Sequence, residues 1–440
     1  MITLDKAVQI ILEGVVPLGL EKIPTAESYG RILGESIVSK QNIPKYNLAA
    51  IDGYALSASD TLQVLRSKPA KMTIVGESKP GRIFKGKTKK GNVVKVSAGV
   101  RVPDGFDAVV KFEDVARTEG AKLNVYVKVR AWQNIVRVGK EVSVGDSLMP
   151  AGRVLNAADM ARLVEIGMDD VNVYKKPKIG LISLGDEFLS DSEDDRNPGI
   201  SRNQFLNSLI NQSGAEFIYM GPSPFSTERL DEILKSCKSC DQIIIMAGRS
   251  IENYNFLKKC FRELNIELKF WRVAIKPGKS VLFGYYEGIP IFGVSGNLWS
   301  VAVLFDQLVK PLISRQSGLK DIKKLEVIAR ITKELRVNPS MTQFFKAVVK
   351  VEQDGFTVSP ILERSAGELW ALSIANGLII IPPETHSIQA GNKVRVEILG
   401  PLAVSAPYEE SIYSSENYNS SKRVHRGVAD PQRININRKD

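Results

Sequence analysis

The chain has 440 residues, of which 43% are hydrophobic and 25% charged, so it is long enough for about three domains and is neither disordered nor fibrous. Lys and Arg outnumber Asp and Glu by 60 to 49, and the net charge of +11 favours an anionic partner such as a phosphorylated small molecule, a nucleotide or a nucleic acid. The first residues carry a helical pattern with charges inside it, and no apolar run approaches ~18 residues. We therefore expect a soluble, cytoplasmic protein that does not associate with a membrane.

Cysteine usage agrees with this expectation, because a secreted disulfide framework normally uses an even number and this chain has three. Cys237 and Cys240 form a CxxC pair that could bind zinc or carry redox chemistry, but Cys260 is the only other thiol and the two histidines lie far away in sequence. We interpret KSCKSC as the exposed end of a helix that starts near Thr227.

The first part of the chain predicts a linking region interrupted by a β-rich insertion. Residues 1 to about 26 have the pattern of an amphipathic helix and a turn, and from there to about 140 short β-like runs alternate with Gly and Pro. Residues 156–174 predict a helix followed by a strand. We expect the N-terminal helix to pack with them across the insertion.

Strand and helix alternate in the next part, from KIGLISLG through DQIIIMAG to IPIFGV. This alternation is typical of an open, mostly parallel α/β sheet, in which ligands bind beyond the carboxyl ends of the strands. The segments LGDEF, AGRS and SGN all fall at such ends. Residues from about 324 to 400 then predict a compact β domain, and the last 40 or so have few apolar residues and predict a flexible tail.

The turn VSGNLWS, residues 294–300, lies between an apolar strand and a helical pattern. Asn297 is expected to cap the helix, and Pro311 to mark its end. Gly296 would let the backbone approach a ligand closely, and the free N–H groups at a helix start attract anions. Alone, the turn fits an anion site or a plain connection equally well, and its convergence with the other strand ends favours the anion site.

Three carboxylates lie at positions that suggest a metal-binding or catalytic role. Asp186 and Glu187 directly follow a strand, where paired acids can hold Mg²⁺ and through it a phosphate; the alternative is a solvated helix start with acidic charges. Asp52 lies in AAIDGYAL among small and apolar residues. Its carboxylate would be partly desolvated there, which is costly and points to a functional role. The alternative for Asp52 is a local turn cap.

GRIFKGKT, residues 81–88, matches the phosphate-binding pattern GxxxxGK[ST] of ATPases and GTPases. A phosphate-binding loop must leave a buried strand directly and open a helix. Here Pro80 precedes the match, bulky residues fill it, and another strand-like run follows. We interpret the segment as a basic surface hairpin that binds no nucleotide.

Five segments that occur in order along the chain carry a family resemblance: NLAAIDGYAL, IGLISLGDEF, VAIKPGKSVLFG, VSGNLWS and RSAGELWALSIANGLIIIP. They resemble, in the same order, SAMDGYAV, VxVxSTGDEL, VAMKPGKPxxFG, LPGNPVS and QGSGxLxSLAxANGLIxLP of the molybdopterin molybdenumtransferases. This is the MoeA family, to which the E domain of gephyrin also belongs. The resemblance runs through nearly the whole chain.

The resemblance implies a homodimer of elongated subunits with an active site at the dimer interface. The implied reaction inserts molybdenum, or tungsten, from the oxoanion into adenylylated molybdopterin, with Mg²⁺ and with release of AMP. Other proteins of molybdenum cofactor biosynthesis are expected as further partners, and nucleic acid is not. The resemblance also implies catalytic roles for Asp52, Asp186 and Glu187, of which the last two would bind Mg²⁺. It further implies that the substrate is bound by Ser250, Lys276, Pro277, Gly278, Lys279, Ser295, Gly296 and Asn297.

Several positions depart from the family pattern. VSAGV resembles the family's ITGA, with Ala98 in place of the threonine, and AGRSIENYN resembles GGVSVGExD, with Asn255 in place of the acid. Leu184 replaces the threonine of STGDEL, and Ser295 and Leu298 replace the prolines of PGNP. Removing several polar groups that act together can cost orders of magnitude in rate. The alternative to a working transferase is therefore a catalytically weakened paralogue that binds molybdopterin or acts as a scaffold.

These patterns together predict a multidomain α/β protein with five parts. An N-terminal linking domain comprises 1–26 and 141–175, and a β-rich domain is inserted at 27–140. An α/β domain of the molybdopterin-binding type spans 176–318, a C-terminal β domain spans 319–401, and the tail is 402–440.

Overall fold

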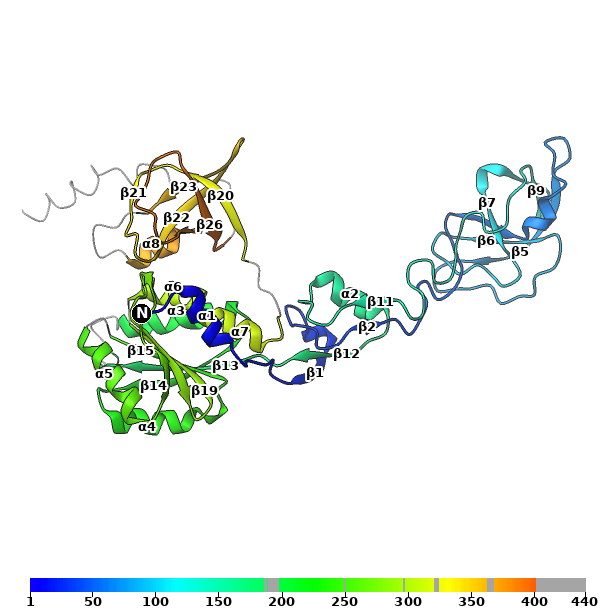
Figure 1. The fold of residues 1–440 in the computed structure, drawn as a ribbon. Helices are drawn as coiled ribbons and strands as arrows, with labels where there is room; N and C mark the ends of the chain where they lie inside the picture. The colour runs from blue at the N-terminus through cyan, green and yellow to red at the C-terminus, as the bar shows by residue number, and fades with distance from the viewer. Residues whose placement is uncertain are drawn as a thin grey trace, which may run out of the picture.

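The computed structural model describes residues 1–185, 188, 198–248, 251–295, 297–319, 324–361 and 368–400. The molecule is elongated (Figure 1): a β-rich domain lies at one end, the α/β and C-terminal domains lie at the other, and a narrow linking region joins them. The predicted multidomain α/β architecture is confirmed. Among the described residues, no helix is long and apolar enough to span a bilayer.

The α/β domain is built on a six-stranded sheet in the order β14-β13-β15-β19-β18-β16. The first four strands run parallel, β18 is antiparallel to β19, and β16 is antiparallel to β18. Runs of Ile, Leu and Val suit strands that are covered on both faces. The strands are β13 (Lys178–Leu184), β14 (Glu216–Ser223), β15 (Gln242–Ala247), β16 (Glu267–Phe270), β18 (Val281–Tyr286) and β19 (Ile289–Ser295).

Helices cover both faces of this sheet. One face packs against α1 (Leu4–Leu12), α3 (Pro198–Gln212), α6 (Leu298–Leu304) and α7 (Lys310–Gln316), and the other against α4 (Thr227–Ser236) and α5 (Ile251–Glu263). The expectation that the N-terminal helix packs with residues 156–174 is wrong. Its buried residues, Ala7 and Ile11, belong to the core formed with α7, because an apolar stripe predicts a partner without specifying which.

Pro311 does not end the helix that begins at Leu298, contrary to prediction. The helix widens into a π-helical turn at Phe305–Val309 and continues as α7 to Gln316. Proline lacks the N–H that an α-helical bond needs, and the wider turn before it lets the chain continue past that missing donor.

The linking region joins segments that are distant in sequence. β1 (Leu20–Pro24) pairs with β12 (Asp170–Tyr174), and β2 (Ile37–Val38) pairs with β11 (Ser147–Met149). The predicted helix and strand within 156–174 are present as α2 (Ala157–Glu165), which Asn156 caps, and β12. The domain boundaries remain a proposal, and the packing of Leu33 and Ile37 against Val142 and Leu163 favours placing the first boundary beyond residue 43 rather than at residue 27.

The distal β domain has the strand order β7-β4-β6-β5-β9-β8, and the short pair β3 (Leu48–Ala49) and β10 (Ile135–Val136) lies where the chain enters and leaves it. β5 and β6 run parallel, so GRIFKGKT belongs to a crossover connection, and the expected hairpin is wrong. No helix opens from this connection. The strands are β4 (Gly53–Leu56), β5 (Ala70–Ser78), β6 (Asn92–Val96), β7 (Ala108–Lys111), β8 (Val115–Arg117) and β9 (Lys122–Val125).

The C-terminal domain is a β domain, as predicted, and the predicted tail at 402–440 lies outside the described residues. Its sheet also includes β17 (Ile275–Lys276), which pairs with β22 and so ties the α/β domain to it. The other elements are β20 (Glu326–Ile331), β21 (Leu335–Arg336), β22 (Thr342–Glu352), β23 (Gly355–Pro360), α8 (Glu368–Ile374), β24 (Gly377–Ile381), β25 (Ser387–Ile388) and β26 (Lys393–Ile398).

A buried ionic cluster lies at the joint between these two domains. Lys324 Nζ lies 2.9 Å from Glu397 Oε2 and also contacts Asp306, which Lys310 approaches at 3.3 Å. Burial, reinforced by the Asp306 charge, raises the pKa of Glu397 to about 7. Burial opposes ionisation of Asp306 as well, but the Lys324 ammonium outweighs it and lowers the pKa of Asp306.

Candidate active site

The carboxyl ends of β13, β15 and β19 lie side by side. Leu184 pairs with Ala247, which pairs with Ser295. The loop before β18 reaches the same edge, because Val281 pairs with Val294 in antiparallel register. The helices after β13 and β15 pack on opposite faces of the sheet, so this edge is a topological switch point, where open α/β sheets bind ligands.

Several predicted site residues follow these strand ends directly in sequence. Asp186 and Glu187 come after Gly185, whose N–H donates to Ser223 O at 2.9 Å. Asp186, Glu187, Ser250 and Gly296 lie outside the described residues, so their expected roles stay predictions. The register of the strands nevertheless places the starts of all three loops at one edge.

The segment 276–279 combines two exposed cations with a glycine that packing requires. Lys276 and Lys279 are exposed, and neither forms an ion pair with a carboxylate in the described part of the chain. Gly278 is buried at φ +98°, and a Cβ there would lie 3.0 Å from Leu304 Cγ on α6. A larger residue would strain the backbone at this φ and would clash with Leu304. Glycine at this position therefore lets the loop lie close to α6. Pro277, between them, is half-buried.

Asn297 caps α6 as predicted: its Oδ1 accepts from Ser300 N at 2.9 Å. Ser295 is half-buried at the end of β19, and Leu298 is buried as the first residue of the helix. Proline is favoured at that first position because the N–H there has no partner within the helix. Leucine loses no helical hydrogen bond there, and the Asn297 cap still forms. The loss of the family's second proline therefore leaves the helix start intact.

Asp52 directly precedes β4 of the distal β domain. That domain lies at the other end of the molecule from the α/β domain (Figure 1). Asp52 is exposed, and its Oδ1 accepts from Ala98 N at 2.9 Å. Because the backbone of Ala98 makes this bond, replacing the family's threonine by alanine does not remove it. A single chain does not bring Asp52 to the edge where the other predicted residues gather.

Sequence reasoning missed a group of aromatic and cationic residues at the same edge. β16 ends at Phe270, beside Phe283 near the start of β18. In the next residues, Trp271 is flanked by Lys258 Nζ, 3.4 Å from its ring centre, and by Arg272 Cζ at 4.6 Å. The stretch KFWRV directly before the predicted loop was the signal available, and it extends the cationic edge beyond Lys276.

Leu184 and Asn255 are the remaining departures from the family pattern, and the three cysteines are all buried. Leu184 is fully buried in β13, and nothing in the structure explains why it replaces threonine; Asn255 is exposed on α5. The helix from Thr227 is confirmed, and the Lys and Ser residues of KSCKSC are exposed at its end as expected. The two cysteines differ from the expectation, because Cys237 and Cys240 pack in the core under α4. A hydrogen bond with Cys240, together with burial, raises the pKa of Cys237.

No described residues form a group of three or more metal-ligating side chains.

Comparison with known proteins gives matches along most of the chain. Residues 2–167 match the MoeA N-terminal region (domain I and II), residues 180–315 a probable molybdopterin binding domain, and residues 329–399 the MoeA C-terminal region (domain IV). The three regions occur in order and together define a three-part architecture. The chain belongs to the MoeA family.

Two relatives and one solved structure show how far the similarity extends. The molybdopterin molybdenumtransferase of Haemophilus influenzae is 28% identical over 403 residues, which cover 90% of this chain and 98% of that protein. The molybdopterin molybdenumtransferase of Bacillus subtilis is 26% identical over 408 residues, covering 90% and 94%. The crystal structure of the molybdopterin biosynthesis MoeA protein from Pyrococcus horikosii matches with a TM-score of 0.80 and 29% identity, over 91% of this chain and 100% of that one.

Proposed function

We propose that this protein is a molybdopterin molybdenumtransferase of molybdenum cofactor biosynthesis. Relatives that carry this name align over nine-tenths of the chain. The observation that carries the proposal is the convergence of Leu184, Ala247 and Ser295 at one edge of the sheet, with the 276–279 loop beside them. The reaction is placed in the cytoplasm, where the three free, buried thiols would stay reduced.

The proposed substrate is adenylylated molybdopterin, which receives molybdenum, or tungsten, from the oxoanion and releases AMP. In this proposal Lys276 and Lys279 hold the phosphate groups, because they are exposed cations without carboxylate partners among the described residues. Gly278 sets the distance between their loop and α6. Ser250 and Gly296 are proposed to bind the same ligand from the neighbouring loops.

The donor set for Mg²⁺ is the carboxylate pair Asp186 and Glu187. Carboxylate oxygens suit Mg²⁺, which normally keeps several waters and binds through one or two carboxylates plus substrate phosphates. When bound, the ion would polarise the phosphate that leaves as AMP. The two acids would therefore orient the phosphate, while the lysines neutralise its charge.

The site is proposed to form between two subunits, with Asp52 of the partner subunit completing it. The support is the elongated shape: the distal domain, which carries Asp52, and the α/β domain lie at opposite ends of one chain (Figure 1). A two-fold dimer would bring each distal domain to the other subunit's edge and create two equivalent sites.

A weakened, pterin-binding paralogue is the competing function, and two contacts count against it. Leu298 occupies a helix position that does not need proline, and Ala98 still donates its N–H to Asp52. These departures from the family pattern therefore leave the local backbone interactions in place.

The test is to mix purified protein with adenylylated molybdopterin, molybdate and Mg²⁺, and to follow AMP by chromatography. We expect AMP release that requires both molybdate and Mg²⁺, and its loss in a Lys276→Ala/Lys279→Ala variant. Lys128→Ala, which removes an exposed lysine of the distal domain, is the matched control. Pterin binding without any AMP release would overturn the transferase proposal in favour of a scaffold.

A further inference from the structure

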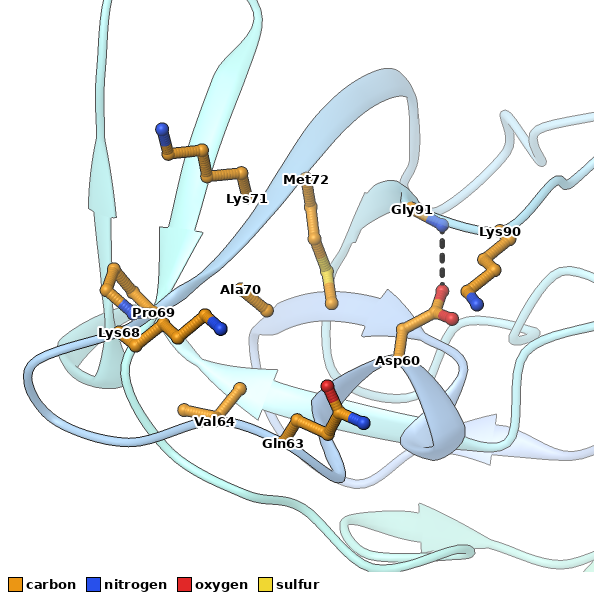
Figure 2. Close-up of a pocket in the computed structure, with 10 residues that line it drawn as sticks. All are labelled: Asp60, Gln63, Val64, Lys68, Pro69, Ala70, Lys71, Met72, Lys90 and Gly91. Carbon is orange, nitrogen blue, oxygen red and sulfur yellow. Dashed lines mark hydrogen bonds between the residues drawn. The ribbon is translucent and has the colours of Figure 1, made fainter.

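The distal β domain contains a cavity that the proposed reaction does not use (Figure 2). Its volume is about 260 Å³. Met72 projects into it from β5, and Gln63 and Val64 form the wall below. Lys68 and Lys90 reach toward it from opposite sides in Figure 2.

The cavity has a net positive charge, because its lining contains three lysines, Lys68, Lys71 and Lys90, and one carboxylate, Asp60. Neither Lys68 nor Lys90 forms an ion pair with a carboxylate among the described residues. Asp60, the acid in the wall, uses Oδ2 to accept from Gly91 N at 2.8 Å and so fixes the backbone next to Lys90. The connection at 79–91 adds to the field, because it contains six Lys and Arg residues and no acid. An anion is the favoured occupant.

The size and the lining of the cavity indicate more than a simple inorganic anion. A water molecule takes up roughly 30 Å³ in the liquid, so about nine waters would fill this volume and a lone phosphate would occupy only part of it. Val64 and Ala70 are half-buried apolar residues of the lining, and Met72, also in the lining, is only 3% exposed and offers a ligand no more than the edge of its side chain. A methionine thioether packs favourably against a flat ring. The ligand that fits has a ring body and an anionic group.

This cavity lies at the opposite edge of the distal sheet from Asp52. β5 and β6 are parallel, and the cavity is next to their first residues, Ala70 and Asn92. Asp52 is next to their far ends, because the following residue, Gly53, pairs with Val96 at the end of β6. Ligand in the cavity is therefore separated from Asp52 by the length of a strand.

We propose that this cavity is a second binding site, for a small phosphorylated ring compound of the nucleoside monophosphate class. Lys68 and Lys90 attract the phosphate from opposite sides, and the ring packs on Val64 and Ala70, against the exposed edge of Met72 and beside the Gln63 amide. A single-stranded nucleic acid fits less well, since its bases stack on aromatic side chains and none lines the cavity.

Methyl NMR of the full-length protein labelled at its eight methionines tests the proposal. The Met72 signal is assigned from the spectrum of Met72→Leu, a volume-conserving change that a core tolerates. We expect AMP to shift this signal with a dissociation constant of about 0.1–1 mM, and adenosine or inorganic phosphate alone to need at least ~10-fold higher concentrations. Because Met72 and Asp52 lie at opposite ends of the distal sheet, AMP bound at the α/β edge beside Asp52 does not contact Met72.

Charge variants provide the second arm of the test. Lys68→Gln and Lys90→Gln should each weaken AMP binding by roughly 3- to 10-fold, and Lys128→Gln, in the same domain, should leave it unchanged. No shift of the Met72 signal at 10-fold the expected range overturns the proposal. So does an equal shift from inorganic phosphate alone, or an equal loss of affinity in Lys128→Gln.

Discussion

The α/β edge and the distal β domain both present unpaired lysines, but the two regions hold them differently. Lys276 and Lys279 lie in a loop that Gly278 fixes against α6, next to the ends of three buried parallel strands. Lys87 lies in an exposed crossover within GRIFKGKT, the more familiar motif of the two. The position of a loop relative to strand ends therefore marks the site better than a match to a short pattern.

The largest effect that would sharpen this comparison is expected for Glu187→Gln. If Asp186 and Glu187 hold Mg²⁺ at the α/β edge, Mg²⁺-dependent AMP release should fall by roughly 100-fold while the melting temperature stays within about 2 °C. AMP release and thermal unfolding are measured on the same sample. Unaltered turnover with a lowered melting temperature would show that the acid only supports a helix start.

A shared site would join the two regions across subunits, and a mixing experiment tests this. Asp52→Asn and Lys276→Ala chains should each be nearly inactive, and unfolding and reassembling them together should restore about a quarter of the wild-type activity, because half of the random dimers carry one intact site. Light scattering should give about twice 48.5 kDa. No recovery in a mixture that refolds to dimers would place both residues in one subunit's site. Full activity of either variant alone would exclude a role for that residue.

The buried ionic cluster around Glu397, beside the α/β domain, should make the free energy of unfolding depend on pH. The distal domain should not share this dependence. The pKa of Glu397 is raised to about 7, so its native state binds more protons than the unfolded state between pH 4.5 and about 7. The stability that Glu397 contributes is therefore greatest at low pH and is lost as pH rises through this window. Urea unfolding across pH 4.5–7.5 should show a decline in wild-type protein that Glu397→Gln flattens.

The smallest effect is expected for Lys87→Ala in the crossover loop. This lysine is exposed and does not line the cavity, so AMP release and nucleotide affinity should both stay within about twofold of wild type. A ~100-fold loss of nucleotide affinity would instead restore the phosphate-loop interpretation of GRIFKGKT.

The sequence predicted the strand ends better than it predicted how domains meet. Apolar runs followed by Gly and polar residues located the ends of β13, β15 and β19, because buried strands and tight turns have strong local patterns. The contacts of α1 and the burial of Cys240 were predicted wrongly, since an apolar face or a short CxxC segment does not identify its packing partner.

In the candidate site, too, the sequence predicted local features but not contacts between domains. Asn297 was identified as a cap from its place before a helical pattern, and its bond to Ser300 confirms this. The pairing of Ile275 with Thr342 was not predictable, because two-residue strands have no periodicity to detect. The distance between Asp52 and the α/β edge depends on the whole linking region, which local patterns do not describe.

The pairing of β3 with β10 closes the distal domain off as an insertion that could be exchanged as a unit. Ala49 and Ile135 are register partners, and Ala50 N donates to Asn134 O at 2.8 Å, so the chain leaves and returns at neighbouring points. A turn of a few residues could close this gap. Evolution could thus replace or reshape the whole insertion, and with it whatever small molecule the cavity recognises, without disturbing the backbone that positions the α/β edge.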